Sequence, residues 1–503
     1  MMRSFGWTLP AAFTLLSLAA SAPAAEAAVF IPNKTADTAD GTCNAADCSL
    51  REAVIAANQS SGEDVIILHS GVYRLTLAGT GEDQAATGDL DVTGDLAVVG
   101  DGGTSTVIDG AGLDRILSVA SGVSLELNGV YLRNGRAQGA VQNGGAILNH
   151  GALTITRSIL SGNSAASGFG GAIYTDGQAV LTIVDSTLAS NVANGGGGGI
   201  AIGGTASLTN VTLTGNRSET DFGGGLYVFS DAEATFNNVT ITANTAAQKG
   251  GGLFAELSAF IGVAPLFSNS ILAGNFASSE PDCSGSASSG GYNVVGNASN
   301  CLSFSPAKND KVGTTASPLD PKLGALAENG GPTPTQALLP GSPAIDAGNP
   351  AVPGTGGNAC PATDQRGAPR PSTTSTPRCD SGAYEITSSC LAGGGTLCLN
   401  EGRFKVTATW RTVNASGTAQ GVTLTGDTGY LWFFDPANVE VTIKVLNGCG
   451  LNNRYWVFAG GLTNVEVTLT VTDTVTGAVK TYGNPQGRNF RPVLDTSAFA
   501  TCP

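Results

Sequence analysis

The acidic side chains that could take part in chemistry gather in one stretch, residues 83–114. Asp89 and Asp91 are two positions apart, which places both on one face of a strand, and Asp95 follows closely. Carboxylates grouped in this way are ligands of the kind that Ca²⁺ prefers. The favoured interpretation is nevertheless structural, because an Asp beside Gly in a bend caps the turn with its own side chain. Calcium held by Asp89, Asp91 and Asp95 is the weaker alternative, and no other cofactor is expected.

Between residues 140 and 275 the charged side chains do not gather. Enzymes that cleave polysaccharides need a cluster of carboxylates, with a basic residue to take a proton in the calcium-dependent lyases. The acidic residues here fall at different places in their repeats, and so do Arg157, Arg217 and Lys249. His150 has no evident carboxylate partner and is expected to be a solvent-facing turn residue. The sequence therefore assigns no catalytic residue.

The elements that would position these residues are marked by an internal repeat. A Gly-Gly pair followed by an apolar residue recurs, with the apolar residue at positions 147, 173, 200, 226 and 253, a step of 26 or 27. Short alternating strands follow in each unit, and each unit closes on an asparagine. Such constant units indicate a parallel solenoid in which every strand pairs with its equivalent one coil away. The closing asparagines are Asn163, Asn191, Asn216, Asn244 and Asn275.

This pattern predicts an all-β protein with a right-handed parallel β-helix, a pectin-lyase-like solenoid, over residues 85–310. About nine coils at about 4.8 Å each would make a rod roughly 40–45 Å long. The recurring asparagine is expected to satisfy backbone groups at a bend and to stack as a side-chain ladder. A two-sheet sandwich is the alternative for this region, and the constant coil length disfavours it.

The first 27 residues have the pattern of a signal peptide. Arg3 is the only charge of a short leading region, residues 11–20 are apolar, and Ala25-Glu26-Ala27 offers a cleavage site. An apolar run of about 10 residues is too short to span a bilayer, and no transmembrane segment is expected in the mature chain. The formal charge of −15 disfavours nucleic acid as a partner. We therefore expect a secreted or cell-surface protein.

Ten cysteines suit an oxidising compartment. Three pairs lie close together in the sequence, and the last four cysteines allow three pairings, among which the sequence does not choose. A zinc site is disfavoured, because no Cys-x-x-Cys occurs and the chain has two histidines. The local pairs are Cys43 with Cys48, Cys283 with Cys301 and Cys360 with Cys379, and the remaining four are Cys390, Cys398, Cys449 and Cys502.

Residues 398–503 contain alternating apolar and polar runs that predict an antiparallel β-sandwich. Five aromatic residues in this domain are able in principle to stack on sugars. Filling the sandwich core is the favoured role, since aromatics in alternating strands usually do so. These residues are Trp432, Phe433, Phe434, Tyr455 and Trp456.

Four stretches resemble known families or modules of exported bacterial proteins. One of them, residues 398–503, looks through segments 431–436 and 454–458 like an accessory module common at their C-termini. Residues 48–53, Cys-Ser-Leu-Arg-Glu-Ala, resemble the CSLREA motif, which implies that residues 28–84 form a cap with a short helix shielding the first coil. The Gly-Gly-Ala-Ile units are similar to repeats of polymorphic outer membrane proteins. Residues 328–385 resemble the choice-of-anchor Q module, through motifs such as 341–348 and 364–367, which implies that residues 311–390 end the β-helix and form a linker.

Taken together, the repeat, the signal peptide and the resemblances favour a non-catalytic protein acting in adhesion, surface structure or glycan contact. An extracellular polysaccharide or a cell-surface component is the expected partner. A polysaccharide lyase or glycoside hydrolase on the same scaffold is the alternative. Three or more converging acidic and basic side chains in a groove along one sheet would favour the enzyme.

Overall fold

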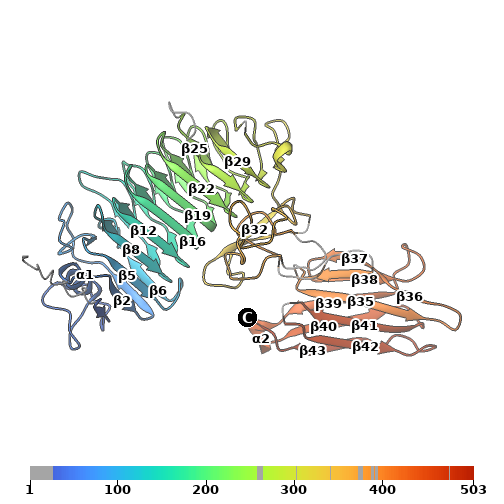
Figure 1. The fold of residues 1–503 in the computed structure, drawn as a ribbon. Helices are drawn as coiled ribbons and strands as arrows, with labels where there is room; N and C mark the ends of the chain where they lie inside the picture. Colours follow the sequence, from blue (N-terminus) through green and yellow to red (C-terminus); the bar gives the residue numbers. More distant parts are fainter. Residues whose placement is uncertain are drawn as a thin grey trace, which may run out of the picture.

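The computed structural model describes residues 27–257, 264–301, 303–339, 341–371, 378–386, 390, 395–400, 402–474 and 476–502. Strands make up 41% of the protein and helices 4%. A parallel β-helix of about 8 turns is followed by antiparallel sheets, so the predicted fold class is confirmed (Figure 1). The predicted signal peptide, residues 1–27, lies outside the described residues except for its last position.

The strands of the β-helix form three parallel sheets. Each strand pairs with the equivalent strands of the coils on either side. Sheet 1 contains two strand segments per coil, sheet 2 contains one, and sheet 3 contains one short strand in each of five coils. The strands of sheet 2 are β4 (Leu90–Val92), β7 (Leu117–Val119), β11 (Ile147–Asn149), β15 (Ile173–Thr175), β18 (Ile200–Ile202), β21 (Leu226–Val228), β25 (Leu253–Ala255) and β28 (Cys283–Gly285).

Sheets 1 and 3 complete each coil. In sheet 1, β16 and β19 each run through both segments of the coil without a break. Sheet 1 comprises β1 (Val29–Phe30), β2 (Asp64–Leu68), β3 (Gly71–Arg74), β5 (Leu96–Gly100), β6 (Thr106–Asp109), β8 (Ser124–Asn128), β9 (Tyr131–Arg133), β12 (Ala152–Thr156), β13 (Ile159–Ser161), β16 (Val180–Ala189), β19 (Thr205–Thr214), β22 (Glu233–Asn237), β23 (Thr240–Thr242), β26 (Leu266–Ser268), β27 (Ile271–Leu272), β29 (Ser288–Gly291), β30 (Val294–Val295) and β31 (Lys311–Val312). Sheet 3 comprises β10 (Arg136–Ala137), β14 (Ser164–Ala165), β17 (Val192–Ala193), β20 (Arg217–Ser218) and β24 (Thr245–Ala246).

The coils begin earlier than residue 85. β1 pairs in parallel with β2, and β2 pairs with β5, so the region expected to be a separate cap already contributes strands to sheet 1. The inward residues stack in register: Ile147, Ile173, Ile200 and Leu226 lie one above the other and are fully buried. This stacking of aliphatic side chains removes apolar surface from water along the whole rod and is its main stabilising contribution.

The predicted asparagine ladder is present. In each rung the backbone N–H and the side-chain Nδ2 both donate to the Oδ1 of the next rung, at 2.9–3.1 Å. Each Nδ2 also donates to a backbone carbonyl of the coil behind, as Asn216 does to Leu188 at 3.0 Å. The ladder starts at Asn163 and ends where Asn275 donates to the carboxylate of Asp282.

The N-terminal helix α1 (Leu50–Gln59) packs against β2 and β4 of the first coils. Ser49 is its N-cap and forms a capping box with Glu52. The guanidinium of Arg51 is fully buried and binds Asp37 at 2.7 Å. Arg51 and Glu52 therefore have structural roles in the cap.

Residues 319–386, here called the arm, leave the last coil and return along the bend of sheet 1. The arm contains the hairpin β32 (Leu323–Ala327) and β33 (Thr335–Leu338), and the 3₁₀ helix η1 (Pro306–Lys308) precedes it. Bend residues with left-handed backbone, among them Asn210, Asn238 and Asn269, donate side-chain hydrogen bonds to arm carbonyls.

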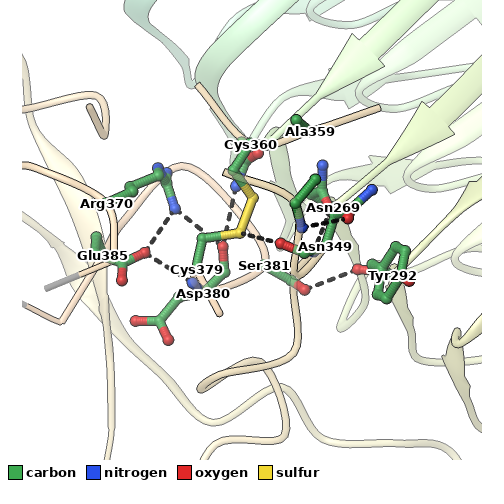
Figure 2. Close-up of a disulfide and its surroundings, with 12 residues drawn as sticks. Asn269, Tyr292, Asn349, Ala359, Cys360, Arg370, Cys379, Asp380, Ser381 and Glu385 are labelled. Carbon is green, nitrogen blue, oxygen red and sulfur yellow. Dashed lines mark hydrogen bonds and ion pairs between the residues drawn. A yellow bond between two sulfur atoms is a disulfide. The ribbon is translucent and has the colours of Figure 1, made fainter. Parts of the chain in front are cut away.

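Within the arm, a buried ion pair lies beside a disulfide. Figure 2 shows Arg370 joined to Glu385 at 2.9 Å, near the Cys360–Cys379 bond. Ser381 donates to the carbonyl of Tyr292 in the β-helix at 2.8 Å. The arm thus covers the bend of sheet 1 rather than the outer face of sheet 2.

The last domain is an antiparallel sandwich, as predicted. Five disulfides form in the protein, and the four cysteines left open by the sequence pair as Cys390–Cys398 and Cys449–Cys502. The three local pairs are also confirmed. One sheet holds β34 (Thr396–Leu399), β35 (Phe404–Arg411), β36 (Ser416–Thr418), β41 (Glu466–Asp473) and β42 (Val479–Asn484); the other holds β37 (Gln420–Thr425), β38 (Thr428–Trp432), β39 (Val441–Asn447), β40 (Tyr455–Gly461) and β43 (Val493–Phe499), with α2 (Cys449–Asn452) between β39 and β40.

Candidate functional site

The outer face of sheet 2 presents one residue from the middle of each strand. In β15 the neighbours Ile173 and Thr175 are fully buried, whereas Tyr174 between them is partly exposed, so the middle position points away from the core. The register places these middle residues next to one another along the rod. In order they are Asp91, Ser118, Leu148, Tyr174, Ala201, Tyr227, Phe254 and Ser284, here called the sheet 2 file.

Aromatic rings surround the second half of this file. Phe169 and Phe229 lie against Tyr227, with ring centroids 5.3 and 4.8 Å from it, and Phe254 lies 5.2 Å from it. Tyr174 contacts Phe229 at 6.3 Å, and Phe222 stacks on Phe254 at 4.4 Å. These six rings form one continuous cluster on the outside of the sheet, and all except Tyr227 are partly exposed.

Tyr227 is held at the centre of the cluster by two contacts. Its hydroxyl donates to Glu256 Oε1 at 2.6 Å, and Glu256 Oε2 accepts from the N–H of Ser230. Gly196 lies under the ring, where a Cβ atom would overlap it. Burial and the bond to Glu256 raise the pKa of Tyr227, so it remains a neutral hydrogen-bond donor.

A pocket of about 390 Å³ lies at the N-terminal end of the same file. Asp91, Ser118 and Leu148 of the file line it, so the pocket and the aromatic cluster are continuous through the Leu148–Tyr174 pair. Glu82, Asp83 and Asp89, from the segment before β4, line it further. The remaining lining includes Arg115 just before β7, Gln138 and Val141 after β10, and His150 directly after β11.

Asp89 and Asp91 are both buried in the wall of this pocket. Asp89 Oδ2 accepts no hydrogen bond within the described structure, and the nearest cation is Arg115 Nη1 at 3.6 Å. Asp91 Oδ2 accepts from the N–H of Ala85 at 3.0 Å. Arg115 Nη2 donates to the carbonyl of Val141. Both aspartates line the same pocket, as their i, i+2 spacing led us to expect.

The surroundings favour the protonated form of both aspartates. Burial, followed by repulsion from Asp91, raises the pKa of Asp89 to about 7. Burial raises the pKa of Asp91 to about 6, with further repulsion from Glu82 and Asp83. The pocket therefore concentrates carboxyl groups that one cation, Arg115, compensates only in part.

His150 lies on the rim of the pocket, and its contacts differ from those predicted. Its Nδ1 contacts Asp176 Oδ2, the carboxylate of the next coil. The expectation that His150 has no carboxylate partner was wrong. The reason is that residues 26 positions apart meet across adjacent coils, which separation along the sequence conceals.

The cap helix positions the pocket. Arg51 donates to the carbonyls of Ala85, Gly88 and Asp89 at 2.8–3.2 Å, which fixes the loop that carries Asp89. Asn58 Nδ2 donates to the carbonyl of Asp91 at 2.7 Å. Helix α1 thus fixes the backbone on which both aspartates lie.

The suggested calcium ligands do not all meet. Asp95 accepts from the N–H of Ser124 at 2.8 Å in an exposed position and does not line the pocket with Asp89 and Asp91. Within the described ranges, no group of three or more His, Cys, Asp or Glu side chains is placed to hold a metal ion.

The aromatic residues of the last domain are divided between core and surface. Phe433 and Tyr455 are buried in the sandwich core, in line with the favoured interpretation. Phe434 is 53% exposed and packs edge-on against Trp410. Trp456 donates to Asn452 at 2.8 Å. The most extended aromatic surface described is therefore the one on sheet 2.

The chain was compared with protein-family models, with curated proteins and with solved structures, and none of the three comparisons found a match. Among the described residues, no helix is long and apolar enough to cross a membrane.

The sheet 2 file was missed in the sequence, although a signal for it exists. Tyr174, Tyr227 and Phe254 each directly follow the apolar residue of the Gly-Gly repeat. The periodicity that identified the core therefore also marks its outward neighbour. Arg115 and His150 carry no such signal, because only the coil geometry brings them to Asp89.

Proposed function

We propose that this is an exported, non-catalytic β-helix protein that binds an extracellular polysaccharide along the sheet 2 file. The observation that carries the proposal is the cluster of six aromatic rings on the outside of that sheet. Five of the six rings are partly exposed, and a contiguous aromatic patch of this kind is uncommon on a protein that has no partner for it. Aromatic faces stack on the C–H faces of sugar rings while the surrounding polar groups bind hydroxyls.

The shape of the surface favours a polymer. Eight strands at about 4.8 Å spacing give a face about 34 Å long, which is longer than one or two sugars. The arm covers the bend of sheet 1, so that side of the rod is already occupied. The five disulfides suit the oxidising environment in which such a polymer is found.

The test is affinity electrophoresis and calorimetry with a panel of soluble polysaccharides and their oligomers. Replacing Tyr174 and Phe254 together with Ala should weaken binding about tenfold or more, since each stacked ring contributes roughly 0.5–1.5 kcal/mol. Phe276→Ala is the control, because Phe276 is 60% exposed and lies outside sheet 2. Equal affinity of the double variant and the control would contradict the proposal.

The enzymatic alternative is supported by one observation, the convergence of Asp89, Asp91, Arg115 and His150 on one pocket. The same panel decides between the two functions. Release of reducing ends or of unsaturated products by the wild-type protein, abolished in Asp91→Asn, would replace binding with cleavage as the function.

A further inference from the structure

The pocket at the N-terminal end of the sheet 2 file is acidic on several sides. Glu82 and Asp83 come from the loop before β4, and Asp89 and Asp91 from the strand and its entry. Arg115 is the lining cation, and His150 contacts Asp176 on the rim. Asp114, also buried, lies next to Arg115 in the sequence. Carboxylates therefore outnumber cations in the wall.

One carboxylate in this wall has an unused acceptor. Asp89 is 3% exposed, and its Oδ2 accepts no hydrogen bond among the described groups. Arg115 Nη1, at 3.6 Å, is beyond hydrogen-bond distance. A buried acceptor without a donor costs free energy, which a ligand that donates a hydrogen bond would recover.

The pocket is joined to the surface assigned to the polysaccharide. Leu148 forms part of its lining and is the register partner of Tyr174, the first ring of the aromatic cluster. A chain stacked along the rings would therefore reach the pocket within one or two coil spacings, about 5–10 Å.

We propose, on the basis of the proposed function, that this pocket receives an amine-bearing sugar unit of the bound polysaccharide. A protonated amine brings three N–H donors and one positive charge. It would donate to Asp89 Oδ2 and face Asp91, and the bond between an ammonium and a carboxylate is of the stronger, charge-assisted kind. The same wall repels uronic acids, so the protein discriminates against acidic polysaccharides.

The high pKa values of the two aspartates fit this assignment. Both groups are partly protonated near neutral pH because burial disfavours their charges, with added repulsion from Asp91 on Asp89 and from Glu82 and Asp83 on Asp91. A bound cation would relieve that repulsion and lower both pKa values. Binding of the amine should therefore release protons to the buffer.

The experiment compares three oligomers of equal length on the full chain: a β-1,4-linked glucosamine hexamer, its N-acetylated counterpart and a hexagalacturonate. At about pH 6.5 and low ionic strength, we expect roughly tenfold tighter binding of the amine than of the acetylated form, and the weakest binding of the uronate. Asp91→Asn should remove the preference for the amine, so that the amine and acetylated hexamers bind with similar affinity. Thermal unfolding of Asp91→Asn verifies that the variant is folded, and Asp83→Asn, at an exposed rim position, is expected to have a smaller effect.

The outcomes separate this inference from the function on which it rests. Equal affinity for the amine and acetylated hexamers, with no effect of Asp91→Asn, overturns the amine site even if Tyr174 and Phe254 are required. Absence of binding to all oligomers and polysaccharides overturns the proposed function itself. Titration with calcium chloride alone completes the test: calcium binding that Asp91→Asn abolishes would identify a metal ion as the occupant and contradict the amine.

Discussion

At the scale of single residues, Gly196 offers a sharp test of the aromatic face. Replacement with Ala would push against the Tyr227 ring, because the added Cβ would overlap it. We expect Gly196→Ala to cost about 1–3 kcal/mol and to weaken polysaccharide binding, since overpacking displaces the ring from the cluster. Near-ultraviolet circular dichroism and denaturant unfolding measure the two effects.

Gly177→Ala is the matched control for this change. Gly177 also lies in a turn beside sheet 2, and a Cβ there would approach no atom closer than 3.9 Å. An unchanged dichroism spectrum in Gly196→Ala, with the same stability as Gly177→Ala, would mean that Tyr227 is not held as described.

Residue types alone predicted part of the site. Asp89 and Asp91 were identified because an i, i+2 pair shares a strand face, which is a local property of the chain. Arg115, Leu148 and His150 reach the same pocket from three later positions, and only the step of the coil brings them there. The Cys449–Cys502 bond was also unpredictable, since it joins residues 53 positions apart that only the folded last domain brings together.

At the scale of elements, the cap helix is expected to matter through Arg51. Its guanidinium makes five hydrogen bonds in a fully buried site, which Lys cannot reproduce with a single ammonium. Arg51→Ala should destabilise the protein by about 3–5 kcal/mol, because it leaves the buried Asp37 carboxylate with two backbone N–H donors but no cation. Arg74→Ala, at an exposed position, is the control in chemical denaturation. A cost similar to that of Arg74→Ala would contradict this role.

The asparagine ladder predicts a different element-scale effect. Asn216 is a middle rung, and its removal leaves the N–H and the amide of Asn191 without their acceptor. We expect Asn216→Ala to cost about 2–4 kcal/mol, since each unsatisfied buried group costs about 1–3 kcal/mol. Hydrogen exchange should show the loss of protection confined to the adjacent coils.

Asn414→Ala is the comparison for that variant, because Asn414 is exposed in the last domain. Loss of protection spread evenly over all coils, or a cost no larger than that of Asn414→Ala, would be inconsistent with a ladder of local bonds. The ladder itself was foreseen from the sequence, because its asparagines recur in phase with the Gly-Gly pairs. The route of the arm was not foreseen. Its motifs imply that the β-helix ends, but they do not indicate that the chain returns along sheet 1.

At the scale of the whole molecule, raised pKa values link stability to pH. Burial and the charge of Glu385 raise the pKa of Asp380 to about 8, and burial raises those of Asp89 and Asp91 to about 7 and about 6. A carboxyl with a raised pKa in the folded state holds its proton there more tightly than in the unfolded chain. Its contribution is therefore complete below the unfolded pKa of about 3.8 and is lost as the pH rises through the folded value.

Stability should accordingly fall between about pH 4 and pH 8, by several kcal/mol in total, since a pKa difference of one between the folded and unfolded states corresponds to about 1.4 kcal/mol. Denaturant unfolding at a series of pH values measures the slope. Asp380→Asn removes the largest of the three shifts and should flatten the curve above about pH 7. A stability that rises over this interval, or a slope unchanged in Asp380→Asn, would contradict the assignment.

The asparagine ladder has a direction, since the N–H and Nδ2 of each rung donate to the Oδ1 of the next rung towards the C-terminus, while its own Oδ1 accepts from the rung before. Each inner rung therefore presents the same donor on one side and the same acceptor on the other. Duplication of one whole coil would insert a rung whose donors and acceptor already match both neighbours, with Gly135 and Asp282 still closing the two ends of the ladder. The length of the sheet 2 face is thus adjustable by tandem duplication within the gene, one coil at a time, with no redesign of either end.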